Sequence, residues 1–362
     1  MFEITQNVAD LCLECGACMD QCVFLPSVCS APKSLAEDML SKRYVAKTNI
    51  PFLCNMCGKC ADVCPEELNI GDMLWEVRRS MVEEDIPLPG MVKYVKNQQN
   101  FVTSDQFFYA GGAPSGNTTR MFFPGCHLSG YSPDLVEAAW DWLNVHDPNC
   151  GILLTCCGAP SYDTGNVPEY ERIVAKVKDT MEKFGATDLV LACTNCTKHF
   201  RDCTEGVNTI SLYEVMDNAW DTPRSDAHGK WVMHDPCKSK SLPQVQTAAR
   251  SLLAKAGYVV VNPNHSGANT RCCGQGGLVA YTDAKWAEKL SKVRADEIGG
   301  DLVTYCASCR QAMRPLDRPG VHILDLLFAA DVDAAKMVEA KGTADAKASQ
   351  IRTHELLANR GK

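Results

Sequence analysis

Ten of the 21 cysteines in this 362-residue chain fall into two copies of one pattern, a single Cys followed by a Cys-Cys-Gly and then by a C-x-x-C. The first copy consists of Cys126, Cys156, Cys157, Cys193 and Cys196, and the second of Cys237, Cys272, Cys273, Cys306 and Cys309. Thiolates bind metals and iron–sulfur clusters when several of them converge from distant parts of a chain. The repeated long-range spacing therefore predicts two metal centres of one kind.

Eight further cysteines form two runs near the N-terminus. They are Cys12, Cys15, Cys18 and Cys22, and then Cys54, Cys57, Cys60 and Cys64. Two such runs are the signature of a bacterial two-cluster ferredoxin, in which the fourth Cys of each run ligates the other cluster. The runs predict one [4Fe–4S] cubane on Cys12, Cys15, Cys18 and Cys64, and a second on Cys54, Cys57, Cys60 and Cys22. Zinc is the alternative, but it would use one C-x-x-C from each run and leave four cysteines idle.

Helices are expected between and after these two runs, because residues 33–47 and 72–84 carry apolar side chains at helical spacing. The predicted N-terminal domain is therefore an α-helical ferredoxin domain over residues 1–86. Residues 87–120 are rich in Pro, Gly, Asn and Ser, which is linker composition. The Ala- and Lys-rich residues 331–362 have few large apolar groups and predict a solvated helical tail.

From Arg120 onward the chain is an internal duplication. In each copy, short apolar strands end at the single Cys and at the C-x-x-C, and amphipathic helices lie between them over residues 169–184 and 283–298. This alternation predicts two pseudo-symmetric α/β domains with small parallel sheets, over residues 121–228 and 229–330. Cysteines at the carboxyl ends of parallel strands stand where open α/β sheets bind ligands. Each C-x-x-C is expected to open a helix, whose N-terminal N–H groups favour thiolates.

The number of cysteines in each set argues against a simple cubane or a zinc site. Five thiolates exceed the four that a cubane or a structural zinc ion needs. Because neighbouring side chains on one backbone are expected to point apart, Cys156 and Cys157 should serve adjacent irons, or bridge them, rather than bind a single iron.

The two sets, with the flanks Cys-Cys-Gly-Ala-Pro, His-Asp-Pro-Cys and Cys-Cys-Gly-Gln-Gly-Gly, resemble the CCG, or cysteine-rich, domain family typified by heterodisulfide reductase catalytic subunits. A helical ferredoxin domain before two CCG repeats is similar to the layout of the heterodisulfide reductase subunits in which these parts are fused. The iron–sulfur subunits of anaerobic glycerol-3-phosphate dehydrogenase and glycolate oxidase share this layout. The resemblance covers residues 1–330 and implies a non-cubane [4Fe–4S] cluster in each five-cysteine set.

The resemblance also implies an activity. In the family, the non-cubane clusters receive the sulfurs of a disulfide and split it in one-electron steps. We therefore expect a catalytic subunit of an anaerobic redox complex, which takes electrons from a partner through its cubanes and reduces a disulfide-bonded thiol cofactor or carrier protein. The alternative is an electron-transfer subunit that passes electrons between a flavin dehydrogenase subunit and a quinone or membrane partner, without disulfide chemistry. A zinc-stabilised interaction protein is a third hypothesis, which metal analysis would decide.

Composition narrows the remaining classes. The formal charge of −8 and the scattered Lys and Arg residues do not predict nucleic-acid binding. No leader and no apolar run near 18 residues is evident, so a cytoplasmic location is expected, with any membrane contact made through a partner. Cytosolic thiols are kept reduced, which disfavours disulfides. No flavin or nucleotide fingerprint is present, so a flavin-containing or cytochrome electron donor would be another subunit.

Other residues near the cysteine sets carry weaker signals. Three thiols lie outside every set and are expected to be free and buried: Cys29, Cys150 and Cys203. Three imidazoles flank predicted ligands and are candidates for proton donors or hydrogen-bond donors: His127, His199 and His234. Four cations also flank predicted ligands. They could offset the negative charge of a cluster, hold an anionic substrate or lie on solvated surface: Lys198, Lys238, Arg271 and Arg310.

Overall fold

The computed structural model describes residues 2–42, 48–316, 318 and 320–360. The chain forms two compact units. Unit 1 comprises the chain up to Asn97 together with Pro160–Tyr170 and Arg271–Arg294, and unit 2 comprises the other described residues. Each unit therefore combines segments that are distant in sequence.

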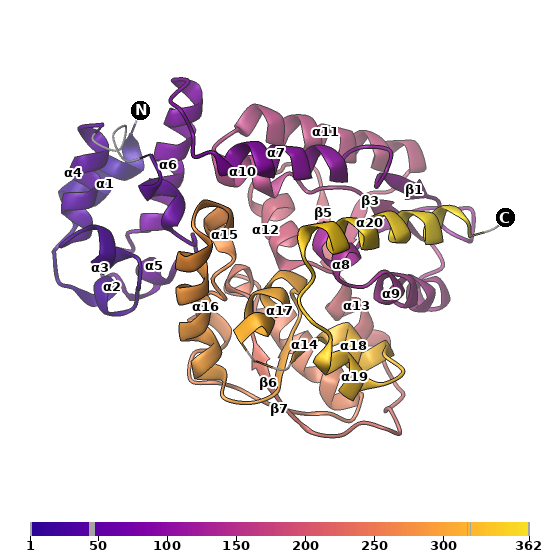
Figure 1. The fold of residues 1–362 in the computed structure, drawn as a ribbon. Coiled ribbons are helices and arrows are strands. Elements are labelled where there is room, and N and C mark those ends of the chain that lie inside the picture. The colour runs from indigo at the N-terminus through magenta and orange to yellow at the C-terminus, as the bar shows by residue number, and fades with distance from the viewer. Residues whose placement is uncertain (1, 43–47, 317, 319, 361–362) are drawn as a thin grey trace. The chain divides into compact units, whose positions relative to one another are not determined.

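The N-terminal part of unit 1 is helical. Its elements are α1 (Glu3–Leu11), α2 (Ala17–Asp20), α3 (Leu25–Val28), α4 (Pro32–Leu40), the 3-10 turn η2 (Ile50–Leu53), α5 (Lys59–Val63) and α6 (Ile70–Glu83). Helices α1, α4 and α6 pack together around buried apolar side chains such as Leu35, Phe52 and Met73 (Figure 1). The predicted helices between and after the two Cys runs correspond to α4 and α6. Residues 43–47 of the first prediction lie outside the described residues.

Two later segments complete unit 1. They contain α10 (Ala159–Thr164), the first turn of α11 (Val167–Phe184), η5 (Gly276–Leu278), α15 (Val279–Thr282) and most of α16 (Ala284–Ile298). Trp75 of α6 stacks on Tyr162 at 4.7 Å between ring centroids and donates its Nε1–H to the Tyr162 carbonyl at 2.7 Å. Trp286 of α16 donates to the carbonyl of Leu53 at 3.1 Å. Both segments thus contact the helices around the N-terminal Cys runs.

Unit 2 contains two sheets. The first runs in the order β1 (Tyr109–Gly111), β3 (Cys150–Leu154), β2 (Arg120–Phe123), β4 (Asp188–Leu191) and β5 (Asn208–Ser211). The second runs in the order β7 (Val259–Val261), β6 (Lys230–His234), β8 (Leu302–Thr304) and β9 (Gly320–His322). All neighbours pair in parallel except β1 with β3. Apart from β1, both sheets have the doubly wound order second-first-third-fourth, which confirms the predicted pair of parallel α/β repeats.

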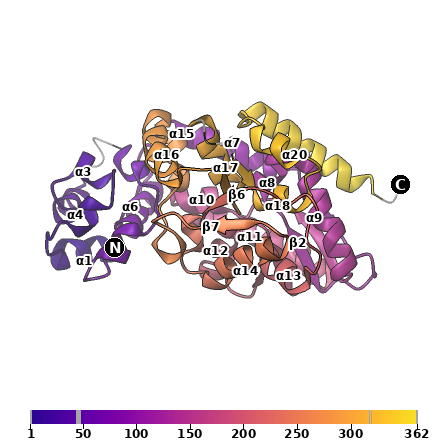
Figure 2. The ribbon, with the colours of Figure 1, turned by 90° about the horizontal axis from the view of Figure 1, so that it is seen from below.

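The remaining helices are α7 (Met91–Val102), α8 (Cys126–Tyr131), α9 (Pro133–His146), α12 (Thr194–Asp202), α13 (Leu212–Ala219), α14 (Pro243–Lys255), α17 (Ala307–Met313), α18 (Ile323–Phe328), α19 (Val332–Met337) and α20 (Thr343–Ala358), with short 3-10 turns at Cys237–Ser239, Gly267–Asn269 and Arg314–Leu316. Helix α13 of the first repeat lies beside α14 of the second (Figure 2). Apolar residues of both repeats, such as Val190 and Val303, belong to one core. The parts of the two repeats that lie in unit 2 therefore form a single packed body.

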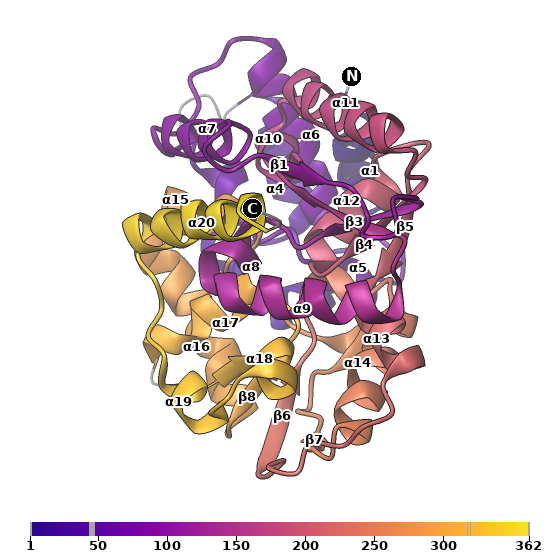
Figure 3. The ribbon, with the colours of Figure 1, turned by 90° about the vertical axis from the view of Figure 1, so that its right-hand side faces the viewer.

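Two segments with polar composition are structured. Residues 87–120, where composition indicates a linker, contain α7 and the edge strand β1. Helix α20, in the segment where composition indicates a solvated helix, packs along α8 and α9 (Figure 3). Its Gln350, Thr353 and Leu357 are buried, and Gln350 donates to the carbonyl of Cys126 at 2.8 Å. None of the described helices is long and apolar enough to cross a bilayer.

Candidate iron–sulfur sites

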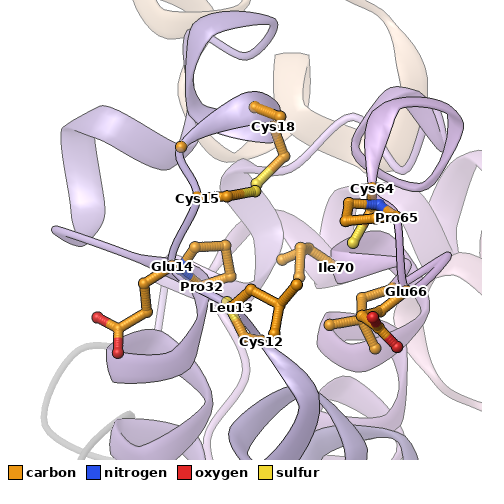
Figure 4. A pocket seen from close by; sticks show the side chains of 13 residues that line it. Cys12, Leu13, Glu14, Cys15, Cys18, Pro32, Cys64, Pro65, Glu66 and Ile70 are labelled. Carbon is orange, nitrogen blue, oxygen red and sulfur yellow. The ribbon is translucent and has the colours of Figure 1, made fainter.

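The first four-thiol group, called site I, consists of Cys12, Cys15, Cys18 and Cys64, which line one pocket of unit 1. In Figure 4 their side chains surround a common space, three from the first Cys run and one from the second. Cys12 follows α1 directly, Cys15 precedes α2, Cys18 lies within α2, and Cys64 ends α5. The structure thus brings together the same four thiols that the two-cluster signature assigns to one cluster, with the fourth Cys taken from the other run.

The second four-thiol group, called site II, consists of Cys22, Cys54, Cys57 and Cys60, which line another pocket of unit 1. Cys272 of the second CCG pattern also lines this pocket. Backbone N–H groups donate to three of the sulfurs: Leu25 to Cys22 at 3.5 Å, Met56 to Cys54 at 3.3 Å and Ile70 to Cys60 at 3.3 Å. Such bonds are a common feature of cluster-bound sulfurs and influence their reduction potentials.

The chemistry of these thiols fits a metal cluster. All 21 cysteines are free of disulfide bonds. Burial, together with nearby thiols, raises the pKa of Cys18 to about 11 and that of Cys60 to about 12. Such thiols keep their protons at neutral pH, whereas a bound metal ion deprotonates a coordinating thiol outright. Four converging thiols in each pocket therefore suit a [4Fe–4S] cluster, which would supply or take up one electron at a time.

The first CCG set lies entirely in unit 2. Cys126 begins α8 after β2, Cys156 and Cys157 follow β3, and Cys193 caps the N-terminus of α12 after β4, with Cys196 in the first turn of that helix. These are the carboxyl ends of the three central strands, on both sides of the point where the strand order reverses. Ligand sites of doubly wound sheets lie at this point. The C-x-x-C opens a helix, as the sequence predicts.

The five thiols of this set contact one another in a continuous series. Cys156 hydrogen-bonds with Cys126 and Cys157, and Cys196 hydrogen-bonds with Cys157 and Cys193. Hydrogen bonds from Cys156 and Cys196 lower the pKa of Cys157, and the same bonds raise the pKa values of the two donors. A series of five thiols, each in contact with the next, offers more ligands than a cubane uses.

The expectation that Cys156 and Cys157 point apart is wrong, since their thiols interact directly. Gly158 adopts φ 82°, a left-handed conformation that other residues rarely take, and its N–H donates to the sulfur of Cys156 at 3.3 Å. A tight turn thus follows the two thiols directly.

The second CCG set is divided between the units. Cys237, Cys306 and Cys309 belong to unit 2, where Cys237 follows β6 and the C-x-x-C opens α17 after β8. Cys272 and Cys273 belong to unit 1, where Ser291 of α16 donates to the Cys273 carbonyl at 2.7 Å. Within unit 2, Cys237, Cys306 and Cys309 stand after β6 and β8 as Cys126, Cys193 and Cys196 stand after β2 and β4.

The flanking imidazoles differ in their surroundings. His199 of α12 is buried and interacts electrostatically with Cys157. The residue His127 is exposed, but desolvation of its ring lowers its pKa, although the charge of Cys157 acts in the opposite direction. His234 is fully buried at the end of β6. His127 is thus the one of these three that is open to solvent.

The flanking cations also separate into classes. Arg310 is fully buried, donates to the carbonyl of Gly320 at 3.1 Å and lies 5.1 Å from the Tyr131 ring centroid, so it braces the fold. Arg271 lines the pocket of site II. Lys198 forms an ion pair with Asp202 on the surface, and Lys238 is half-buried.

The three remaining thiols are placed outside the sets. Cys29 is half-buried and donates to the carbonyl of Leu25 at 3.3 Å. Cys150 is fully buried in β3, and Cys203 ends α12. The structure brings none of these three into the first CCG set.

Sequence reasoning missed a buried tyrosine between the two repeats. Tyr213 of α13 donates its O–H to the carbonyl of Ala192 at 2.7 Å and lies 3.4 Å from both the Tyr305 carbonyl oxygen and His322 Nε2. Ala192 and Tyr305 each precede the C-x-x-C of their repeat. One phenol therefore contacts equivalent points of both sites. No local sequence pattern marks Tyr213, since its partners come from three distant segments.

Two family models match the chain. The 4Fe-4S dicluster domain matches residues 8–68, which contain both N-terminal Cys runs. The cysteine-rich domain matches twice, over residues 121–201 and 231–314, and each match contains one complete five-cysteine set. The matched segments thus carry all 18 cysteines of the four groups.

Curated relatives align with most of this chain. The chain is 26% identical to a subunit of the fumarate reductase (CoM/CoB) of Methanothermobacter marburgensis, over 87% of this chain and 71% of that protein. It is 23% identical to a subunit of the dihydromethanophenazine:CoB–CoM heterodisulfide reductase of Methanosarcina barkeri, over 83% of this chain and 87% of that protein. An uncharacterized iron–sulfur protein of Methanococcus maripaludis is also 23% identical, and the chain spans 56% of its length.

The family matches and the grouping of the thiols point to the same architecture. The chain belongs to the iron–sulfur proteins that join a 4Fe-4S dicluster domain to two copies of the cysteine-rich, or CCG, domain.

Proposed function

We propose that this chain is the iron–sulfur subunit of a redox complex that takes electrons through two [4Fe–4S] cubanes and reduces a disulfide-bonded thiol at its two CCG sites, each with a non-cubane [4Fe–4S] cluster. The observation that carries the proposal is the series of five contacting thiols at the carboxyl edge of the first sheet. Relatives named as subunits of a heterodisulfide reductase and of a CoM/CoB fumarate reductase support it.

The assignment of ligands follows from the groups already described. Sites I and II hold the cubanes, and the sets that begin at Cys126 and Cys237 hold the other two clusters. Reduction of one disulfide consumes two electrons and two protons and yields two thiols. The electrons come from another subunit, flavin-containing or a cytochrome, and the protons come from solvent. Exposed His127, beside Cys157, is the candidate group for passing a proton to a product thiolate.

The first experiment measures iron and the response to thiols. Protein purified without oxygen is expected to contain about sixteen irons per chain. Adding CoM or CoB, the thiols in the names of these relatives, to the oxidised protein is expected to change the EPR signal of a CCG cluster. Unchanged signals at both CCG sites would contradict disulfide chemistry, and zinc in place of iron would end the cluster assignment.

A pair of variants localises the response. Cys157→Ser is expected to remove about four irons per chain and the signal of the first CCG site. Cys203→Ser, which changes a thiol outside every set, is the matched control and is expected to retain both. Equal iron loss in the two variants would count against the ligand assignment.

The second candidate is an electron-transfer subunit that connects a flavin dehydrogenase subunit with a quinone or membrane partner. The name of the fumarate reductase relative favours it, because that name includes an oxidant other than a disulfide. Three results together would support this candidate over the first. The chain would co-purify with a flavin subunit, the substrate of that subunit would reduce the clusters, and no disulfide would be reduced.

A further inference from the structure

The two cubane sites share a backbone but differ in charge. The runs Cys12-Leu13-Glu14-Cys15-Gly16-Ala17-Cys18 and Cys54-Asn55-Met56-Cys57-Gly58-Lys59-Cys60 have identical spacing, so their positions correspond one to one. Glu14 and Met56 have φ values of 53° and 51°, and Gly16 and Gly58 have φ values of 81° and 71°. On this common backbone, site I carries Glu14 and Ala17 where site II carries Met56 and Lys59.

Site I is acidic and open to solvent. Among the described residues that line its pocket, the charged ones are Glu14 and Glu66, both exposed. The Cys15 thiol is exposed, and Leu13 beside it keeps 64% of its surface accessible. Water therefore reaches this site easily, and the nearest charges are negative.

Site II is surrounded by cations in a more enclosed setting. Lys59, Arg271 and Arg294 line its pocket, and Asp20 is the carboxylate among the described lining residues. Lys59 is 5% exposed and Arg294 is 1% exposed, and Lys59 Nζ lies 3.9 Å from the nearest carboxylate oxygen of Asp62.

A fourth cation lies behind the site II thiols. Arg78 of α6 is fully buried and donates to the Cys54 carbonyl at 3.3 Å. It also donates to the carbonyls of Pro51 and Asp163. The positive charge around site II is therefore held in fixed positions by the fold.

These differences in charge and exposure change the free energy of adding an electron to each cluster. Reduction makes a cluster more negative, and its potential depends on surrounding charge, on hydrogen bonds to the sulfurs and on solvent exposure. Buried cations stabilise the reduced form with little screening, whereas exposed carboxylates oppose it and are screened by water and salt. The three N–H groups that donate to site II sulfurs act in the same direction as the cations.

We propose that site II has the higher reduction potential of the two cubanes and that Lys59 and Arg294 are the residues that raise it. An electron on the dicluster domain then resides at site II, whose pocket is also lined by Cys272 of the second CCG set. Site I, with its exposed thiol, serves as the relay toward a partner. The inference rests on the proposed function only in that both sites hold cubanes.

The test is a redox titration of the full chain without oxygen, followed by EPR. Cys15→Ser and Cys57→Ser assign the two cubane signals to site I and site II. In the unmodified protein the site II signal is expected to appear at the higher potential. Lys59→Met, which keeps the length of the side chain and removes its charge, is expected to lower the site II potential and leave site I unchanged.

Matched variants separate charge from packing. Lys59→Arg keeps the charge and is expected to retain the potential of site II. Glu14→Gln, on the surface, is expected to raise the potential of site I and to narrow the gap between the sites. A higher potential at site I in the unmodified protein would overturn the inference, as would unchanged potentials in Lys59→Met and Glu14→Gln with iron content intact. Loss of the cubane signals from the unmodified protein itself would instead contradict the proposed function.

Discussion

The two CCG repeats of unit 2 have the same strand order but different interiors. At six equivalent positions the first repeat has Phe123, Pro124, Ala192, Thr197, Ser211 and Glu214, and the second has His234, Asp235, Tyr305, Arg310, His322 and Asp325. The first repeat thus fills these positions mainly with small or apolar groups, and the second fills them with aromatic, imidazole and charged groups. A duplicated backbone therefore supports two chemically different surroundings, and we do not expect the two CCG sites to behave as copies.

Two buried carboxylates show the difference most clearly. Asp235 is fully buried and accepts hydrogen bonds from Arg250 at 2.9 and 2.7 Å and from Tyr305 at 2.7 Å. Burial alone would raise the pKa of Asp235, but these donors and the Gly267 N–H outweigh it and hold the pKa below its ordinary value. For Asp325 burial prevails and raises the pKa to about 6, although Tyr131 donates to it at 2.7 Å.

The largest effect is expected from Asp235→Asn. The substitution leaves Arg250 and the Tyr305 hydroxyl without a buried negative partner, and breaking a buried pair in this way costs about 3 to 5 kcal/mol of unfolding free energy. Chemical denaturation of the full chain measures it. The first-repeat control is Asp147→Asn, whose partner Arg120 is 38% exposed, and its cost should stay below about 1 kcal/mol. Equal losses of unfolding free energy in Asp235→Asn and Asp147→Asn would contradict the difference between the interiors of the two repeats.

A pH-dependent effect of intermediate size is expected at Asp325. Its folded pKa lies above the ordinary value of 3.8, so the folded state binds the proton more tightly than the unfolded state. This protonation stabilises the folded state by up to about 3 kcal/mol. The stabilisation is present below pH 4 and is lost as the pH rises through 6. The unfolding free energy of the unmodified chain should therefore fall over this range relative to Asp325→Asn.

The first repeat provides a control for this pH dependence of the unfolding free energy. Glu214 occupies the equivalent position, and burial also raises its pKa, but its side chain is only half-buried. Glu214→Gln should therefore change the pH profile less than Asp325→Asn does. Parallel profiles for the unmodified chain and Asp325→Asn would contradict the prediction.

The smallest effect is expected from Tyr213→Phe. Burial, together with Arg310, lowers the pKa of His322 to about 3, so its ring is neutral. Because His322 Nδ1 accepts the Leu324 N–H, Nε2 carries the hydrogen and faces the Tyr213 oxygen. Removing that oxygen leaves the Ala192 carbonyl and the imidazole N–H without their partner, at a cost of about 1 to 2 kcal/mol. EPR should show changes at both CCG sites, and a change at one alone would contradict a shared contact.

Local patterns in the sequence predicted the elements that position the thiols. Amphipathic spacing over residues 169–184 and 283–298 matches α11 and α16, and both C-x-x-C segments open helices. The grouping of the eight N-terminal cysteines into two crossed sets follows from spacing alone, and the structure brings the same groups together. These features depend on contacts between near neighbours or on a repeated spacing.

The parts that escaped prediction depend on contacts between distant segments or on the geometry of one turn. Arg78 donates to the carbonyls of Pro51 and Asp163, which lie 27 and 85 residues away, and nothing in its own helix indicates this. The contact between Cys156 and Cys157, just before the turn at Gly158, also escaped prediction. Lys59 could have been noticed, since it replaces Ala17 of the first run, but its burial was not evident from the sequence.

The division of unit 1 into three segments has a consequence for synthesis of the chain. Chains emerge from the ribosome from the N-terminus, and domains generally fold as units when all of their residues are available. The hydrogen bond from Arg271 to Gln21 spans 250 residues, and the unit ends only at Arg294. The N-terminal Cys runs are thus made first, but their packing is completed only when the chain has been translated as far as Arg294, after most of unit 2. The surroundings of the two cubane sites therefore form late in synthesis, and a fragment that stops at residue 97 lacks part of its own fold.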